Sequence, residues 1–272
     1  MKSFYKILID GMDDTLTVTG IVRGAAWVGA ELSNGSFGIA MNTEGESVGR
    51  MFPSLMGLGA KTAAQAVMSW SFNEASEAMA VINAFYNTTE RMERLGFEDD
   101  GKSCTDGMDI AGKTIALIGH LKLGDEALRG AKEVFIIERE PRDGDLPDSA
   151  CEYILPECDV AIITGSAAVN KTMPRLVELS ENAKTIIIGP SVPMCPALKT
   201  LCVDRLSGMV VTDKDGIIDW MQKERGNPYP FGKSFMIDLK TEPILALFYF
   251  RLFPMRIKHF STAPYDALRG IT

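Results

Sequence analysis

The sequence has few of the residues on which disulfide frameworks and tight metal sites depend. It contains five cysteines and two histidines among 272 residues. The cysteines are odd in number and scattered, and none of them forms a C-x-x-C pair. This pattern predicts neither a disulfide framework nor a standard zinc site. We therefore expect reduced thiols that are mostly packed inside the protein.

Long apolar runs and an excess of positive charge are also missing. No stretch approaches the roughly 18 apolar residues that a membrane span needs, and the first residues lack the apolar core of a signal peptide. The formal net charge is −8, which works against binding a phosphate backbone. We expect a soluble, cytoplasmic protein without a transmembrane segment, and no nucleic acid as a partner.

The first third of the chain changes its hydrophobic period from strands to helices. Residues rich in Val, Ile, Thr, Trp and Gly predict three strands, and an Asn-Gly pair between the last two favours a tight turn. Helical periodicity follows, and Gly96 is a plausible stop. The strands are expected at 16–23, 25–31 and 38–42, and the helices at 61–71, 73–87 and 88–95. This order predicts an α+β domain over residues 1–105.

Strands and helices alternate over residues 106–240, beyond a charged, glycine-rich connection at 97–112. The apolar runs are short, β-branched and nearly continuous, as strands covered on both faces are. Strands are expected at 114–118, 133–137, 160–164, 185–188 and 209–211, and helices near 124–130, 148–155, 173–182, 196–202 and 216–223. The fold class is therefore α/β, with a Rossmann-like parallel sheet in this second domain.

In such a sheet, ligands bind outside the carboxyl ends of the strands. Glycines follow three of the first four predicted strands, and polar side chains accompany them. We take His120 and Glu138 as the candidate catalytic residues. The candidate ligand-binding residues are Gly119, Thr164, Gly165, Ser166, Asn170, Gly189, Pro190 and Ser191.

His120 and Glu138 leave several functions open. His120 falls at a strand end, where it could transfer protons, bind a metal or donate to an anion, or only cap the turn. The loop after the first strand lacks the middle glycine of a G-x-G-x-x-G fingerprint, which disfavours a dinucleotide. Glu138, however, stands where nucleotide-binding sheets place a ribose-binding carboxylate. A nucleotide- or S-adenosylmethionine-dependent transferase is therefore the alternative, and capping also accounts for Ser166 and Asn170.

Two runs in the second domain resemble a known family. ITGSAAVNKT at 163–172 and IGPSVP at 188–193, together with the Gly119-His120 pair and the strand end at Glu138, are similar to bacterial and archaeal proteins described as heavy-metal chelation proteins. The resemblance covers residues 1 to about 240. It implies an enolase-N-terminal-like domain followed by a Rossmann-like domain, with a site between them.

The resemblance implies a ligand but not a reaction. Carried over to this chain, the family's site falls on the candidate residues given above, Ser166 excepted. The ligand would be a transition metal, a metal chelate or the small-molecule precursor of a chelate, and whether the protein is an enzyme stays open. The sequence lacks a dense Cys/His/Asp cluster, so a chelate or its precursor is easier to accommodate than a bare ion.

The last segment, 241–272, lies outside this resemblance. Residues 248–260 are both aromatic and basic, and such a stretch is costly to leave exposed. We expect it to pack on a domain or on the partner in a homodimer. A basic amphipathic helix on a membrane surface is the alternative.

Overall fold

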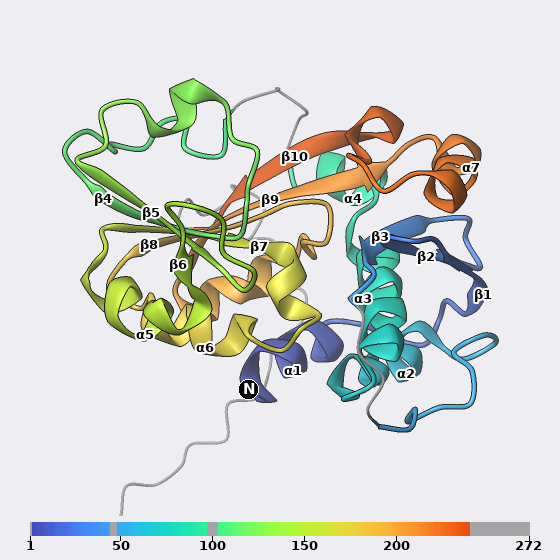
Figure 1. Cartoon of the computed structure of the whole chain (residues 1–272). Coiled ribbons are helices and arrows are strands. Elements are labelled where there is room, and N and C mark those ends of the chain that lie inside the picture. Colours follow the sequence, from blue (N-terminus) through green and yellow to red (C-terminus); the bar gives the residue numbers. More distant parts are fainter. Residues whose placement is uncertain (1, 44–47, 97–102, 240–272) are drawn as a thin grey trace, which may run out of the picture. The chain divides into compact units, whose positions relative to one another are not determined.

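A three-stranded and a seven-stranded sheet organise the residues that this computed structural model describes, which are 2–43, 48–96 and 103–239 (Figure 1). Both sheets belong to one compact unit, residues 1–241. The C-terminal segment, for which packing on a domain or on a dimer partner is expected, lies outside the described residues.

The small sheet is antiparallel and carries a long helix on one face. Its strands are β1 (Val18–Arg23), β2 (Trp27–Leu32) and β3 (Phe37–Met41), in that order. The helices that follow are α2 (Ala60–Ala64), the 3-10 helix η1 (Gln65–Met68), α3 (Phe72–Tyr86) and α4 (Thr89–Arg94). Helix α3 packs on β2 and β3. Gly38 allows the close approach, because a Cβ there would lie 2.0 Å from the Ala84 nitrogen.

The large sheet has the strand order β10-β9-β8-β7-β4-β5-β6. Its strands are β4 (Thr114–Ile118), β5 (Glu133–Glu138), β6 (Leu146–Pro147), β7 (Val160–Thr164), β8 (Lys184–Ile188), β9 (Val203–Val211) and β10 (Gly232–Asp238). Strands β4 to β9 run parallel, and β10 is antiparallel to β9. The chain leaves β4 first to one side and then returns to the other, so the strand order reverses between β4 and β7. This reversal is where open α/β sheets form their binding crevice.

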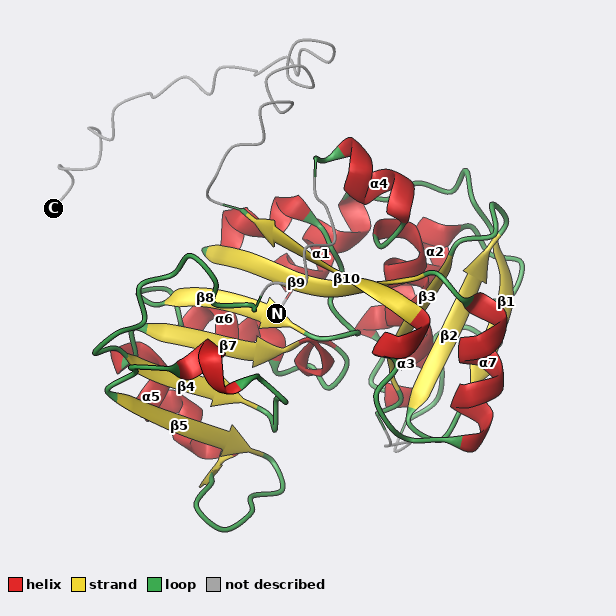
Figure 2. Ribbon diagram, turned by 90° about the horizontal axis from the view of Figure 1, so that it is seen from above, coloured by secondary structure: helices red, strands yellow, loops and turns green. Residues whose placement is uncertain are grey.

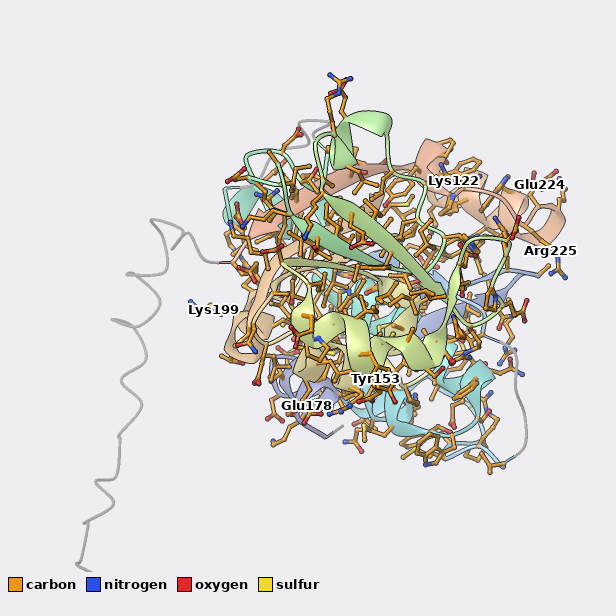
Figure 3. The ribbon with its side chains drawn as sticks, turned by 60° about the vertical axis from the view of Figure 1, so that its left-hand side comes forward. Lys122, Tyr153, Glu178, Lys199, Glu224 and Arg225 are labelled. Carbon is orange, nitrogen blue, oxygen red and sulfur yellow. The ribbon has the colours of Figure 1, made fainter. Side chains whose placement is uncertain are left out.

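Short helices lie between the strands of the large sheet along the chain. They are η2 (Asp125–Leu128), η3 (Asp148–Ala150), α5 (Cys151–Ile154), η4 (Leu155–Glu157), η5 (Gly165–Ala168), α6 (Met173–Leu179), η6 (Pro196–Leu201), α7 (Lys214–Lys223) and η7 (Tyr229–Phe231). One face of β4 and β7 joins the main apolar core with α5 and α6, and the other face packs against residues 104–131. Charged side chains such as Lys122, Glu178 and Lys199 lie at the surface (Figure 3).

The first half of the described chain (up to residue 96) and the second half (103–239) each contribute a helix that packs on the other half. Helix α1 (Lys2–Asp10) packs against α6 and η6, and the Tyr5 hydroxyl donates to the Ala168 carbonyl at 2.7 Å. Helix α7 packs on β1 and β2 (Figure 2), where Ile217 joins a buried cluster with Trp27. Lys214 adds an ion pair with Glu31 at 2.8 Å. Because the helices are exchanged in this way, separating the two halves would expose the apolar faces of both α1 and α7.

The predicted fold class is confirmed, and the predicted elements are mostly present. Strands β4 and β7 have the predicted bounds, and β1, β2, β3, β5 and β8 differ by one or two residues at their ends. The helices expected near 124–130 and 196–202 form as the shorter 3-10 helices Asp125–Leu128 and Pro196–Leu201. Strands β6 and β10, the first six residues of β9 and helix α1 were not predicted. The boundary near residue 105 stays a prediction.

Candidate functional site

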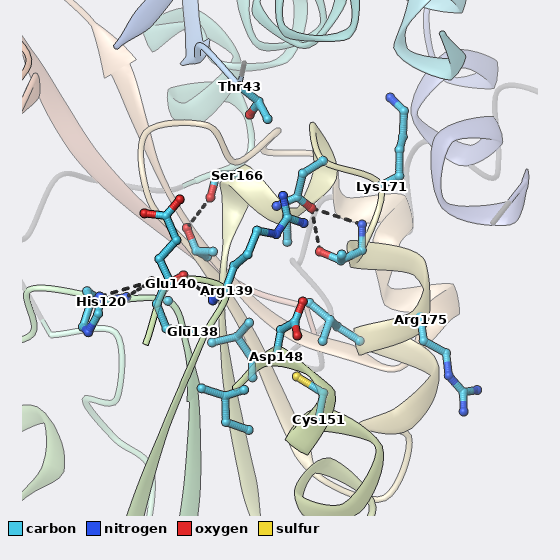
Figure 4. A pocket seen from close by; sticks show the side chains of 18 of the residues that line it. Thr43, His120, Glu138, Arg139, Glu140, Asp148, Cys151, Ser166, Lys171 and Arg175 are labelled. Carbon is cyan, nitrogen blue, oxygen red and sulfur yellow. Dashed lines mark hydrogen bonds and ion pairs between the residues drawn. The ribbon is translucent and has the colours of Figure 1, made fainter. Parts of the chain in front are cut away.

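A cavity of about 850 Å³ opens at the carboxyl ends of β4, β5 and β7 (Figure 4). Its lining also includes residues 41–43 at the end of β3, and side chains from α5 and α6. Both halves of the described chain therefore contribute to one cavity, at the point where the strand order reverses. Of the ten candidate residues, Gly119, His120, Glu138, Thr164, Ser166 and Asn170 line it.

His120 lies between two carboxylates, just beyond the carboxyl end of β4. Its Nδ1 lies 3.2 Å from Oε2 of Glu138, and its Nε2 lies 2.6 Å from Oδ2 of Asp145. The His120 backbone N–H also donates to the same Glu138 oxygen at 3.1 Å. The preceding Gly119 has φ 97°, a conformation that glycine adopts without strain and that turns the chain sharply after β4. The side chains of His120 and Glu138 are each 25% exposed, whereas Asp145 is 5% exposed.

Asp145 was not found from the sequence. It follows a turn at Gly144, whose φ is 92°, and its Oδ2 also accepts the backbone N–H of Arg142 at 2.7 Å. That N–H and the neighbouring His120 hold the pKa of Asp145 below its usual range, so the carboxylate is ionised near neutral pH. The Asp143-Gly144 pair is typical of a turn, but no local pattern indicates that this turn comes back to His120.

The hydroxyl and amide groups after β7 bond mostly to one another. Thr164 Oγ1 lies 3.0 Å from Ser166 Oγ. The Asn170 side-chain oxygen accepts the backbone N–H of Thr172 at 3.2 Å and the Thr172 hydroxyl at 2.6 Å. Asn170 therefore closes a turn just before α6 and does not cap that helix, and it also lines the cavity.

Charged groups of both signs surround the cavity. Arg139 extends into it from the end of β5, and Glu140 and Asp148 lie nearby (Figure 4). Arg175 forms ion pairs with Glu152 and Glu178 at 2.5 and 3.0 Å.

Lys171 lines the opposite side of the cavity from His120 (Figure 4). Its φ is 71°, an uncommon conformation for a residue with a side chain. Its ammonium donates to the Val67 carbonyl and lies 5.3 Å from the centre of the Tyr5 ring. Burial lowers the pKa of Lys171 to about 8. The side chain thus links the β7 loop to α1 and η1.

The other four candidate residues lie outside the cavity lining. Ser191 is 3% exposed, and its hydroxyl accepts the Met41 backbone N–H at 2.9 Å. Gly165 packs against the next loop, since a Cβ on it would lie 2.7 Å from a methyl group of Val192. Gly189 has φ 122° and begins this loop, with Pro190 following it. The proline-rich loop formed by residues 189–196 thus contacts the first half of the chain and joins the two halves.

The donor set does not fit a bare transition-metal ion. Within residues 2–43, 48–96 and 103–239, no group of three or more His, Cys, Asp or Glu side chains could hold a metal. Burial raises the pKa of Cys104, Cys151 and Cys158 to about 11, so these thiols are protonated near neutral pH. The thiolate is the form that binds soft metals. In the same parts of the chain, no helix is long and apolar enough to cross a membrane.

Two family models match the chain, and both are described as "Putative heavy-metal chelation". One matches residues 5–86 and the other residues 106–235. They fall on the two halves that share the cavity. The likeness of the first half to an enolase N-terminal domain stays a prediction.

Known proteins similar to this chain come from bacteria and archaea. A crystal structure of a DUF364-family protein of unknown function from Desulfitobacterium hafniense is 31% identical, with a TM-score of 0.77, and the match covers 87% of this chain and 97% of that one. A second protein of that family, from Pyrococcus horikoshii, is 23% identical with a TM-score of 0.69, and covers 86% and 97%. The uncharacterized protein MJ0500 of Methanocaldococcus jannaschii is 28% identical over an alignment of 132 residues, and the match covers 44% of this chain and 50% of that protein.

Proposed function

The chain belongs to the family described as "Putative heavy-metal chelation", and from this premise we propose that it binds a small metal chelate, or the organic precursor of one. The proposal rests on the presence of a ligand-sized cavity in a protein whose described side chains offer no metal site. A cavity of about 850 Å³, lined by charged and polar as well as apolar side chains, is present, whereas no described group of side chains could hold a metal alone. In such a protein the organic ligand, and not the side chains, supplies the donor atoms.

The size and charge of the cavity support a small polar ligand. Pockets for small molecules typically span about 300–1,000 Å³, a range that includes this cavity. Arg139 provides a guanidinium that can pair with a carboxylate in a two-pronged fashion. Glu140 and Asp148 can meet ammonium groups or the positive charge of a metal complex. Such mixed lining suits a ligand that bears charges of both signs, as many chelators do.

A thermal-shift experiment on the metal-stripped full chain tests this proposal. Zn²⁺ and Ni²⁺ are added as aqueous ions and, separately, as their citrate and histidine complexes. A ligand that binds only the native state raises the melting temperature by mass action. We expect a rise with a complex that exceeds the rise with the aqueous ion, and a smaller rise in Arg139→Ala. The exposed Lys122→Ala is the matched control. Equal shifts with ion and complex, unchanged in Arg139→Ala, would contradict the proposal.

A nucleotide- or S-adenosylmethionine-dependent transferase is the second candidate. Glu138 favours it, because it ends the strand beside β4, where nucleotide-binding sheets carry a ribose-binding carboxylate. Both Glu138 oxygens already accept protein N–H groups, from His120 at 3.1 Å and from Arg139 at 2.7 Å. A ribose would have to share them. Binding of S-adenosylmethionine that is lost in Glu138→Gln would favour this candidate over a chelate.

We propose a cytoplasmic homodimer as the working form of the protein. The aromatic and basic segment 248–260 motivates this proposal. Light scattering on the full chain and on a chain ending at residue 240 tests it. A dimer that becomes a monomer on truncation is expected, and a full-length monomer would contradict the proposal.

A further inference from the structure

The most highly organised group of side chains in the cavity is the row formed by Asp145, His120 and Glu138. The two carboxylates approach opposite nitrogens of one imidazole, at 2.6 and 3.2 Å. Backbone N–H groups of Arg142, His120 and Arg139 fix the carboxylates in turn. Glu138 and His120 line the cavity, and Asp145 stands behind them. The row thus runs from a nearly buried carboxylate to the ligand space.

The position of Asp145 determines which ring nitrogen carries a fixed proton. An ionised carboxylate only accepts hydrogen bonds, so the Nε2 atom, 2.6 Å away, must donate to it. Asp145 is held ionised by the Arg142 N–H and by His120. In the neutral ring the proton therefore stays on Nε2, and Nδ1 carries the lone pair.

A second proton on the ring, when it is present, lies on Nδ1. Oε2 of Glu138 lies 3.2 Å from this nitrogen, so the doubly protonated ring forms an ion pair with that carboxylate. The charged groups placed against this ring are Glu138, Asp145 and, behind Asp145, Arg142. The Nδ1 proton is the one nearest the cavity, and so it is the one that a ligand can reach.

We propose that Asp145, His120 and Glu138 form a proton-transfer relay, in which Asp145 positions the ring, Nδ1 of His120 holds the mobile proton and Glu138 passes it to the ligand. The substrate class is a small chelator with a donor atom that can carry a proton, such as a phenolate, a thiolate or an amine. That identity rests on the proposed function, whereas the relay itself does not.

The transfer balances as a single proton exchange. In one direction the N–H bond at Nδ1 breaks, Glu138 accepts the proton and then yields it to the donor atom of the ligand. The ring is left neutral, and the ligand gains one positive charge. In the reverse direction the ligand returns the proton. Because metals bind deprotonated donor atoms, the first direction releases a metal from the chelate and the second prepares the chelator to bind one.

Nitrogen NMR of the ligand-free full chain tests the relay. The chain has two histidines, His120 and His259, so labelling histidine with ¹⁵N gives few ring signals, and His259→Gln assigns them. As the pH is raised until the ring loses one proton, we expect the Nδ1 signal of His120 to move to the unprotonated region while Nε2 stays protonated. In Asp145→Asn, whose amide can donate to Nε2, the neutral ring is expected to carry its proton on Nδ1.

A second variant, Glu138→Gln, and a check that each variant is folded complete the test. Glu138→Gln is expected to keep Nε2 protonated and to change only the Nδ1 signal, and it covers the case in which Asp145→Asn fails to fold. A proton lost from Nε2 would overturn the relay. A ring that keeps both protons until the protein unfolds would also overturn the relay, because the two carboxylates would then only hold a charged ring in place. No ligand is added, so a failed chelate proposal leaves this result interpretable.

Discussion

The side-chain oxygen of Asn87 accepts the backbone N–H of Met194 at 2.8 Å, across 107 positions of sequence. The same amide donates to the carbonyls of Val192 and Met209, at 2.8 and 3.1 Å. Asn87 caps the end of α3 and is 3% exposed. One buried side chain thus ties the first half of the chain to the proline-rich loop and to β9.

Replacing Asn87 with alanine is expected to lower the free energy of unfolding by about 3 kcal/mol, because buried donors and acceptors that lose their partners cost about 1–3 kcal/mol each. Urea unfolding followed by circular dichroism measures it. Asn182→Ala, at an exposed position, is the control and should change stability by less than about 0.5 kcal/mol. Equal effects of the two substitutions would show that the Asn87 hydrogen bonds contribute little to the free energy of unfolding.

Gly165→Ala is expected to destabilise the protein by about 1–3 kcal/mol, the usual cost of overpacking. An added methyl group would meet a Val192 methyl at 2.7 Å and the Val192 nitrogen at 2.9 Å. Gly124→Ala, which meets nothing within 4 Å, is the matched control. A Gly165→Ala protein that is as stable as the control but no longer binds the ligand would instead assign Gly165 to binding.

Lys171 makes stability depend on pH above about 8. Burial lowers its pKa in the folded state to about 8 from 10.5, so between these values the unfolded chain binds more protons than the folded one. Stability contributed by this group therefore rises as the pH increases through that window, and the burial penalty is fully present below it. Relative to Lys171→Met, the wild type should become more stable between pH 8 and 10.5.

Chemical unfolding at several pH values, with Lys122→Met as the exposed control, measures this difference. The control should follow the wild type throughout. A constant gap between the wild type and Lys171→Met would mean that the lysine stays charged over the whole window.

Glu77 anchors the segment after residue 48. Its carboxylate is 1% exposed and is paired with Arg23 and with Arg50, the latter at 2.6 Å. Glu77→Ala leaves Arg50 partly buried without this partner, and breaking buried pairs costs about 3–5 kcal/mol. Because Arg23 is 56% exposed, we expect about 3 kcal/mol, measured by urea unfolding. Glu181→Ala, on the surface, should be close to neutral, and an equally mild Glu77→Ala would contradict this role.

Most strands of both sheets could be predicted from the sequence because their hydrophobic pattern is local, but β6 and the first six residues of β9 could not. The strand β10 could not, since Gly232, Lys233 and Ser234 give it a polar start, and its position is set by pairing with β9. Helix α1 was missed for a similar reason. Its buried Phe4, Tyr5 and Leu8 are covered by α6 and η6, which lie far along the chain.

The candidate site was predictable where it depends on strand ends. His120 comes shortly after β4, Glu138 and Thr164 are the last residues of β5 and β7, and the parallel sheet brings all three to one edge. Asp145 reaches the site through a loop, so its place depends on tertiary geometry. Ser191 also follows a strand, yet its hydroxyl is used by the Met41 N–H at the joint between the halves, which no local pattern could reveal.

The central claim is that the protein binds a metal only together with an organic ligand. Isothermal titration calorimetry of the metal-stripped full chain tests it most directly, with aqueous Ni²⁺, free histidine and the nickel–histidine complex as three separate titrants. We expect binding of the complex or of free histidine, weakened in Arg139→Ala, and no specific binding of the aqueous ion. Stoichiometric binding of aqueous Ni²⁺ that is indifferent to Arg139→Ala would contradict the account.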